Sequence, residues 1–406
     1  MNFVNRTLHA YVNSNLMMRI LFGLIIGASL ALLVPNITVM TILGRLFIGA
    51  LKAIAPVLVA LLVTSAIAKS RTGLGKRFRT VIALYITSTL IAAVVAVLAS
   101  RAFPIAITLP DTGSYDGEAP GTLADVFLKI VGDIMCNPIT AIANASYLSI
   151  LMWAIILGFA LKKMASAATI DFFQDLASTV TLIVNWIIQC APIGIMGLVY
   201  TSASESGMSI FTTYGKLVAL LVGCMITVSV IINPVISSVL LRRNMWPLLW
   251  KCLKGSALSA FFTRSSAANI PVNMSLCQRL GLDKDFYAVS IPLGSTINMD
   301  GAAITITVMT LATCYTLGIN IDLGSAIMLS IIATFSACGA SGVAGGSLLL
   351  IPLACSLFGI SQDISMQVVA VGFIIGVIQD SVETALNSSS DVFFTATADY
   401  LDRKNK

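Results

Sequence analysis

The segment DSVETALNSSSD, residues 380–391, places polar side chains inside a long apolar run. Asp380, Glu383, Thr384, Asn387 and Asp391 follow one another at steps of 3, 1, 3 and 4 residues, so on a helix they lie along one side. An ionised group at bilayer depth is costly unless it faces other protein, water or an ion. The segment therefore predicts a binding site within a membrane helix.

The composition is that of a membrane protein. Of the 406 residues, 57% are hydrophobic and 10% are charged, whereas soluble domains carry about 25% charged residues. The apolar runs reach about 20 residues, which suits helices that cross a hydrocarbon core about 30 Å thick better than it suits the strands of a barrel. We expect an all-α polytopic membrane protein in a lipid bilayer, with residues 20–34 retained as its first span.

Two other classes of site are excluded by the residues present. The eight cysteines are scattered singly through apolar segments, and the sole histidine, His9, precedes the first span, so a zinc site has no ligand set. The net charge of +6 comes from Lys and Arg in loops. We therefore expect no nucleic-acid partner.

Basic residues in short loops predict the orientation, because cytoplasmic loops carry an excess of Lys and Arg. Such residues precede the first span and occur again at 69–79, 162–163, 242–243 and 403–406, whereas the loop at 104–121 is acidic. Six spans therefore end by about residue 241. Both the N-terminus and the C-terminus are expected to be cytoplasmic.

Beyond the sixth span, two apolar segments are interrupted in the middle. The first, at about 247–275, contains TRSSAANIP and is basic on both sides, so it is expected to be a re-entrant hairpin from the cytoplasm. The second, at about 323–358, contains GASGVAGGS and lacks basic ends, so it is expected to enter from outside. A span at about 285–318, broken at NMDG, lies between them, and a last span covers about 364–398.

The prediction is thus eight transmembrane helices plus two re-entrant hairpins, with an inverted repeat in the C-terminal half. Interrupted segments in corresponding positions of two halves point to a transporter's midplane site, because free backbone groups there bind ligands and sodium. The alternative is that Gly and Ser merely allow close helix packing.

Four acids and one base are expected at membrane depth in this half: Asp300, Asp380, Glu383, Asp391 and Arg264. If Arg264 forms an ion pair with Asp380, the remaining negative charges are not sustainable without partners. The nearby spans lack lysines. Bound Na⁺ would neutralise the site; alternatively, Glu383 keeps its proton, as a desolvated carboxylic acid tends to.

Two other functional classes lack the residues they need. GASG, residues 339–342, has the G-x-S-G form of intramembrane serine proteases, but no histidine lies in a span and no lysine lies near Ser341 to act as a base. A channel would need a continuous polar pathway. We therefore expect no enzyme activity.

The motifs TRSSAANIP, PLGSTINMDG, GASGVAGG and DSVETALNSSSD occur in this order and spacing. In them the chain resembles the dicarboxylate/amino acid:cation symporter family, which includes the glutamate transporters, over nearly its whole length. FFTRSSAANIPVNMSLC is most similar to the family's sodium-coupled serine/threonine branch. The resemblance implies Na⁺-coupled import of serine and threonine across the bacterial inner membrane by an elevator-type homotrimer. The alternative is a sodium- or proton-coupled symporter of acidic amino acids or dicarboxylates.

The resemblance also implies a division of the chain. Residues 1–245 would form mainly the scaffold and the trimer contacts, with the third and sixth spans moving with the transport domain. Residues 246–406 would form the core of that domain.

Site residues are implied by position in the family motifs. Ser266 would hold the substrate carboxylate, and Asp380 and Asn387 would bind its amino group. The implied substrate set is Ser266, Gly342, Val343, Asp380, Glu383, Thr384 and Asn387. The implied sodium ligands are Gly294, Asn298, Asn387 and Asp391 in one site, Asp300 with Thr87 and Ser88 in a second, and Thr296 with backbone near Ala337, Cys338 and Ala340 in a third, with Met299 among them.

The chain departs from the acidic-substrate members at Glu383, where the pattern D-x-x-R-T-x-x-N has arginine. A second substrate carboxylate would be repelled there and would lack its bidentate partner. Glutamate and aspartate are therefore expected to be poor substrates, whereas a short hydroxyl can hydrogen-bond to Glu383 or Thr384. A second departure, Ala337 and Ala340 in place of hydroxyl residues, leaves the third sodium site dependent on backbone.

Overall fold

The computed structural model describes residues 16–34, 37–69, 76–109, 136–144, 146–206, 209–338 and 345–404. Within these ranges every regular element is a helix, which confirms the all-α class. His9, most of the loop at 104–121, and Ala340, Gly342 and Val343 lie outside the described residues.

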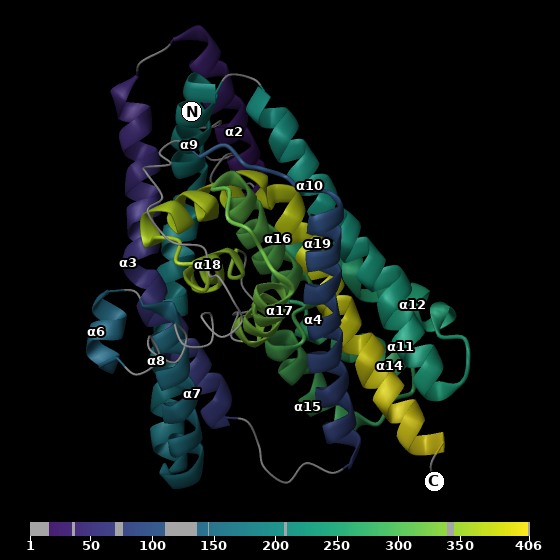
Figure 1. The fold of residues 1–406 in the computed structure, drawn as a ribbon. Coiled ribbons are helices and arrows are strands. Elements are labelled where there is room, and N and C mark those ends of the chain that lie inside the picture. The colour runs from purple at the N-terminus through teal and green to yellow at the C-terminus, as the bar shows by residue number, and fades with distance from the viewer. Residues whose placement is uncertain are drawn as a thin grey trace, which may run out of the picture.

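Figure 1 shows how the helices of the described ranges are arranged. In chain order they are α2 (Leu16–Leu33), α3 (Thr38–Lys69), α4 (Lys76–Ala102), α6 (Pro138–Ala143), α7 (Tyr147–Met164), α8 (Ala167–Gln189), α9 (Ala191–Ser206), α10 (Ser209–Thr227), η1 (Val228–Ile232), α11 (Asn233–Leu241), α12 (Trp246–Cys252), η2 (Leu253–Ala257), α13 (Leu258–Thr263), α14 (Ile270–Arg279), α15 (Lys284–Ile297), α16 (Asp300–Thr316), α17 (Leu323–Ala337), η3 (Leu348–Leu350), α18 (Ile351–Ser356) and α19 (Gln362–Lys404).

Six helical stretches of the described residues are long and apolar enough to cross a membrane. They cover Thr38–Lys69, Arg77–Ala102, Ala167–Gln189, Thr212–Leu241, Lys284–Thr316 and Gln362–Lys404. Shorter apolar helices cover Met18–Leu33, Ala191–Thr201 and Leu323–Ala337. The chain is therefore a multi-pass membrane protein, as its composition predicts.

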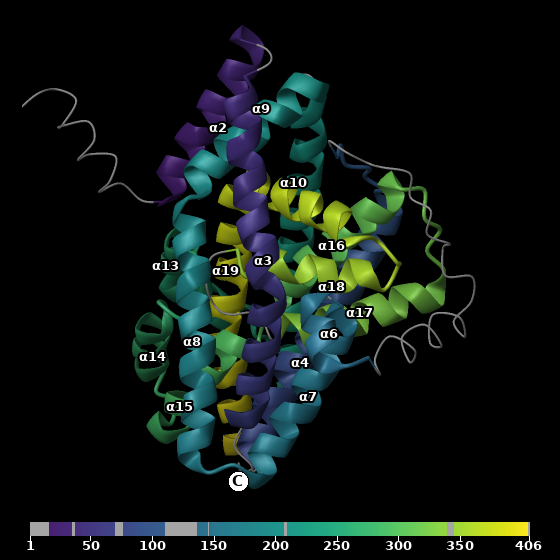
Figure 2. The same cartoon turned by 90° about the vertical axis from the view of Figure 1, so that its left-hand side faces the viewer.

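The first half of the chain is arranged around α3. This helix packs against α7, α8 and α9, and α2 packs along α9; Figure 2 shows α3, α7 and α8 lying lengthwise along the molecule. Gly23 and Gly27 bring the backbones of α2 and α9 together, because a Cβ at either glycine would collide with the carbonyl oxygen of Pro192 or Met196. The helix α4, in contrast, packs against α16, α17 and α19 of the second half.

The predicted sixth span is one continuous helical path with a π turn in it. The turn η1 ends directly before Asn233 and Pro234, which begin α11. Proline has no N–H, so Pro234 cannot bond to the carbonyl of Val230 as the regular helical pattern requires. That carbonyl instead accepts from Trp246 Nε1 at 3.0 Å.

Two breaks expected from the sequence are present in the second half. The helix α13 ends at Thr263 and α14 begins at Ile270, so the break falls within TRSSAANIP. Asn298 and Met299 leave the helical conformation between α15 and α16, within NMDG. Figures 1 and 2 show α19 crossing the bundle with its first part and running along it with the rest.

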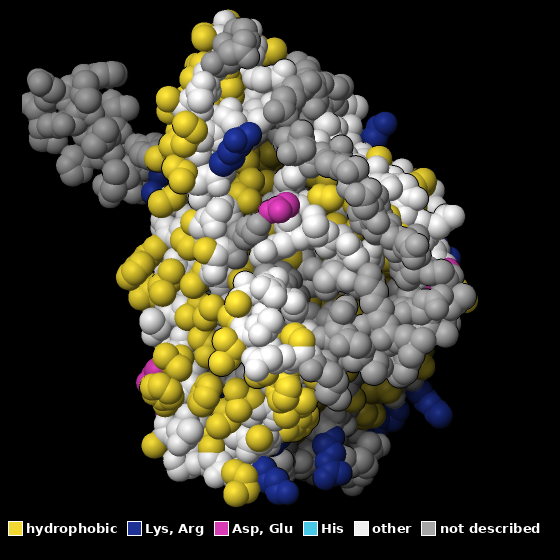
Figure 3. All heavy atoms as spheres, turned by 60° about the vertical axis from the view of Figure 1, so that its left-hand side comes forward, with side chains coloured by type: hydrophobic (Ala, Val, Ile, Leu, Met, Phe, Trp, Pro, Cys, Tyr) yellow, Lys and Arg dark blue, Asp and Glu magenta, His cyan; other side chains and the backbone are white. Residues whose placement is uncertain are grey.

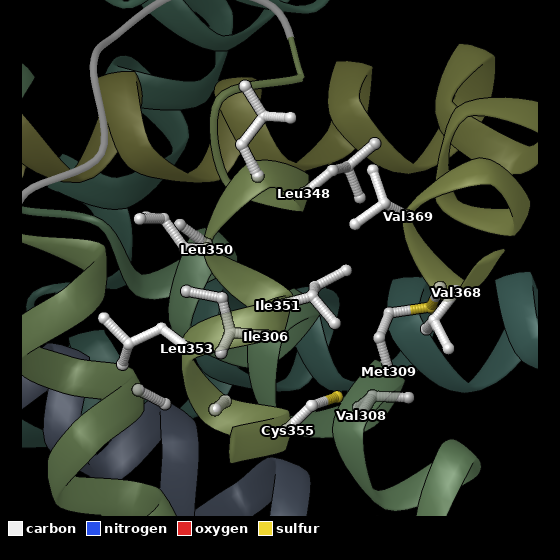
Figure 4. Close-up of a cluster of buried hydrophobic side chains, with 14 of the residues drawn as sticks. Ile306, Val308, Met309, Leu348, Leu350, Ile351, Leu353, Cys355, Val368 and Val369 are labelled. Carbon is white, nitrogen blue, oxygen red and sulfur yellow. The ribbon is translucent and has the colours of Figure 1, made fainter. Parts of the chain in front are cut away.

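An apolar core holds the arm of the second predicted hairpin between α16 and α19. Ile306, Met309, Ile351, Val368 and Val369 are all fully buried and lie together in this core (Figure 4). This packing fixes α18 next to α19. It thereby positions the polar side of α19 against α16.

Hydrophobic side chains gather on the left-hand and lower part of the surface in Figure 3, and several Lys and Arg side chains lie near its lower end. Leu33, Phe103, Trp186 and Val239 are among the large apolar side chains that are more than half exposed. Surfaces of this kind suit contact with lipid or with other chains rather than water.

Candidate ion and substrate site

The polar side of α19 faces the break between α15 and α16. Asn298 is fully buried, and its Nδ2 donates to Asp391 Oδ1 at 2.9 Å and to Ser390 Oγ at 2.8 Å. On the other side of the break, the backbone N–H of Gly301 donates to Asn387 Oδ1 at 2.8 Å. The unwound residues therefore lie directly against the amide and carboxylate groups of α19.

Two oxygens at this contact lack a donor. Asn298 Oδ1 and Asp391 Oδ2 are both fully buried, and no hydrogen-bond partner reaches either one among the described residues. Gly294 is needed here, since a Cβ at that position would lie 2.6 Å from Asp391 Oδ1. Buried acceptors without donors are costly, and hard cations take oxygen ligands. The arrangement fits a small monovalent cation.

A second oxygen cluster surrounds Asp300, which is fully buried at the start of α16. Its carboxylate accepts from Ser88 Oγ at 2.7 Å, from Asn233 Nδ2 at 2.9 Å and from Thr89 Oγ1 at 3.2 Å. Three elements, α4, α11 and α16, meet at this group.

Thr87, which the sequence placed with Ser88, does not lie at this cluster. Thr87 is exposed, whereas Ser88 and Thr89 face Asp300. Successive residues of a helix are about 100° apart, so Thr87 and Thr89 point to opposite sides of Ser88. In α4 it is Thr89 that points toward Asp300. Asn233 was not predicted; its signal is an Asn-Pro pair in an otherwise apolar span.

Glu383 is held by donors from three segments. Its Oε2 accepts from Thr305 Oγ1 at 2.7 Å, from Ser347 Oγ at 3.0 Å and from Gln379 Nε2 at 2.5 Å. Thr305 lies on α16 and Ser347 just precedes η3. All four residues are buried. The three donors were not predicted, and they orient this carboxylate as an acceptor.

The buried pair beside Glu383 joins two breaks in the chain. Arg264 Nε donates to Asp380 Oδ2 at 2.7 Å, and the backbone N–H of Gly345 reaches Asp380 Oδ1 at 3.2 Å. Arg264 has a positive φ of 52° at the C-cap of α13. Buried ion pairs are costly to break because the remaining partner keeps its charge.

Some of the other predicted site residues lie near these groups and others do not. Ser266 and Thr384 are buried near the ion pair, and Thr384 Oγ1 donates to the carbonyl of Asp380 at 2.8 Å. Thr296 is exposed and its hydroxyl donates to the carbonyl of Leu293, so its side chain does not join the oxygens at Asn298. Cys338 Sγ contacts the carbonyl of Ile297 at 3.4 Å.

A further polar group fixes the first predicted hairpin to α19. Asn269 Nδ2 donates to Ser388 Oγ at 2.8 Å, and Asn273 Nδ2 donates to the carbonyl of Ser388 at 2.9 Å. Ser256 Oγ on the opposite arm donates to Asn273 Oδ1 at 2.5 Å. The four side chains are fully buried and none was predicted.

In the described part of the chain, no three His, Cys, Asp or Glu side chains are grouped so that they could hold a metal ion. A cavity of about 490 Å³ lies elsewhere, at the ends of α4 and α16, and Arg101, Tyr315 and Asp322 help to line it. It includes none of the polar residues of α19.

The sequence model of the Sodium:dicarboxylate symporter family matches residues 16–401. The chain belongs to this family. The symporter is also similar over nearly its whole length to curated proteins. The serine/threonine transporter SstT of Bifidobacterium adolescentis is 55% identical over 390 residues, which are 96% of this chain and 90% of the relative. The proteins of the same name from Streptococcus agalactiae and Streptococcus thermophilus are 53% and 51% identical over 396 residues, 98% of each chain.

Proposed function

We propose that this symporter imports serine and threonine together with Na⁺. The observation that carries the proposal is that the structure buries more carboxyl groups than basic side chains at this site. Asp300, Glu383 and Asp391 are buried, and the guanidinium beside them is already paired with Asp380. Na⁺ bound with the substrate would lower the cost of moving these groups across a membrane.

We propose sodium ligands at three sites. Gly294, Asn298, Asn387 and Asp391 would form one site, supported by the two donorless oxygens there. Asp300 would form a second with Ser88 and with Thr89 in place of Thr87, supported by their short contacts. For the third site, only backbone oxygens near Thr296, Ala337, Cys338 and Ala340 are proposed.

The substrate would bind between the two hairpins and α19. Ser266 would contact its carboxylate together with Gly342 and Val343, and Asp380 with Asn387 would contact its amino group. Glu383 and Thr384 would contact its side chain. The three donors on Glu383 Oε2 favour an acceptor role toward a substrate hydroxyl, which agrees with the names of the relatives.

The proposed architecture has eight transmembrane helices and two re-entrant hairpins, with an inverted repeat in the C-terminal half. Residues 246–406 would move as the transport core, and the third and sixth spans would move with it. The packing of α4 against α16 and α17, and of α10 against α19, supports that assignment. We further propose a homotrimer in the bacterial inner membrane with both termini cytoplasmic.

Uptake of radiolabelled serine into proteoliposomes tests the function. We expect uptake to require an inward Na⁺ gradient and to be inhibited by threonine but little by aspartate or succinate. Asp391→Asn should abolish Na⁺-driven uptake, whereas Asp285→Asn, which changes an exposed acid on α15, should behave as wild type. Uptake independent of Na⁺ would contradict symport, and stronger inhibition by aspartate than by threonine would favour an acidic-substrate carrier.

A further inference from the structure

Asn233 lies where α10 and α11 meet through the π turn, and it is buried inside the molecule. Its side chain is 1% exposed, although helices of this span present many apolar side chains outward. The π turn is accommodated because Pro234 follows, so the irregular backbone and the polar side chain occur at the same place. Such turns are frequent at functional sites.

The hydroxyl groups around Asn233 have too few hydrogens to donate to all the acceptor oxygens that they contact. Ser88 Oγ lies 2.8 Å from Asn233 Oδ1 and 2.7 Å from Asp300 Oδ2, yet a hydroxyl has one hydrogen to donate. Whichever oxygen receives it, the other faces Ser88 without a hydrogen between them. Thr89 Oγ1 is shared in the same way, between the carbonyl of Tyr85 at 2.8 Å and Asp300 Oδ1 at 3.2 Å.

The cluster that lacks these hydrogen-bond donors is fully buried. Ser88, Thr89 and Asp300 are each 0% exposed, so bulk water does not compensate for the missing hydrogens. Crowded oxygens at hydrogen-bond distance repel one another unless a positive charge lies among them. A cation would balance this cluster without requiring any further donor.

We propose that Asn233 is itself part of the Na⁺ site at Asp300, with Oδ1 as a ligand and Nδ2 holding the Asp300 carboxylate in place. The inference rests on the proposed function, since it assigns to the sixth span a direct role in coupling. The span would then contribute a ligand in addition to packing against α4, α16 and α19. Lengthening or losing this side chain would weaken Na⁺ binding without touching the substrate groups on α19.

The test is a Na⁺ titration of purified protein, read as the rise in melting temperature with NaCl at constant ionic strength, because a ligand stabilises the folded state that binds it. Asn233→Ala removes both amide atoms, and Asn233→Asp keeps two oxygens. Ser237→Ala is the matched control, because Ser237 is equally buried one turn later and contacts Thr397 rather than Asp300.

We expect the half-saturating Na⁺ concentration to rise about tenfold in Asn233→Ala, which corresponds to about 1.4 kcal/mol, and to change less than about threefold in Ser237→Ala. Asn233→Asp keeps an oxygen in place of Oδ1 but loses the Nδ2 donor, so its rise should be smaller than that in Asn233→Ala. An unchanged titration in Asn233→Ala would overturn the inference, and would indicate that a proton on Asp300 supplies the missing hydrogen. If Asn233→Ala does not fold, a tenfold loss in Asn233→Asp would equally contradict Oδ1 as a ligand. A wild-type protein that responds to serine but not to NaCl would instead refute the proposed symport.

Discussion

At the scale of single residues, Glu383 is buried and one of its two carboxylate oxygens accepts three hydrogen bonds. Thr305, Ser347 and Gln379 all donate to Oε2, so the carboxylate is fixed in direction before a substrate arrives. A fixed acceptor favours a ligand that brings a donor and disfavours one that brings negative charge. Selectivity in this site would therefore depend on neighbours of Glu383 as well as on Glu383 itself.

Replacing the charge tests this argument. Glu383→Arg should lower serine binding at least about tenfold and allow aspartate to compete, because a guanidinium pairs with a second carboxylate. Glu383→Gln, which removes the charge alone, should not gain aspartate binding. Competition against labelled serine measures both effects. Intact serine transport in Glu383→Arg without any aspartate binding would show that this residue does not set selectivity.

The acids could be predicted from sequence because a charge inside an apolar run is expensive and therefore conspicuous. Asn233, Gln379 and Ser388 could not, because neutral polar residues are tolerated in membrane helices when they find a partner. Each also has a partner far along the chain: Asn233 and Asp300 are 67 residues apart, Gln379 and Thr305 are 74 apart, and Ser388 and Asn269 are 119 apart. Spacing alone also does not decide between Thr87 and Thr89, which lie on either side of Ser88 on the helix; in the structure it is Thr89 that contacts Asp300.

At the scale of elements, the first hairpin is bound to α19 by neutral hydrogen bonds. Asn273→Ala should lower the free energy of unfolding by about 1–3 kcal/mol, because Ser256 and Ser388 would each lose a buried partner. Thermal melting in detergent measures the loss. Gln278→Ala, an exposed residue of the same helix α14, provides the comparison; equal melting temperatures for both variants would mean that this cluster does not stabilise the hairpin.

The start of α4 is joined to the C-terminal half by charge. Arg77 contacts Asp283 Oδ2 at 2.7 Å, Asp402 Oδ2 at 2.7 Å and Asp399 Oδ1 at 3.1 Å. The hydrogen bond from Arg77 lowers the pKa of Asp283 from its ordinary value, more than burial raises it. A carboxyl whose folded pKa is depressed stabilises the fold above its unfolded pKa, and this contribution is lost as pH falls through the folded value.

Arg77→Gln should therefore lower the melting temperature near neutral pH, and its difference from wild type should shrink below about pH 4, where unfolded aspartates take up protons. The contribution of Asp283 itself is small because exposed pairs are screened. Arg79→Gln, an exposed arginine two residues along α4, should show no such pH dependence. A difference that stays constant down to pH 3 would indicate that Arg77 acts through packing alone.

At the scale of the whole molecule, the helices around α3 pack among themselves, and α4 packs with the C-terminal half. The hydrophobic side chains exposed on one side of the molecule (Figure 3) suit contact with lipid or with other chains, and we have proposed a homotrimer. We expect the purified protein, after subtraction of detergent, to have about three times the chain mass of 42.8 kDa by light scattering. A monomer that retains full Na⁺-dependent serine binding would contradict the homotrimer.

The close backbone contact between α2 and α9 has a mechanical consequence. Where Gly23 and Gly27 meet the carbonyls of Pro192 and Met196, sliding by even one residue would drive a side chain into the opposing main chain. The two helices are therefore held in one register and should move as a single rigid unit. Any sliding that accompanies a transport cycle must then occur along other, looser surfaces of the bundle.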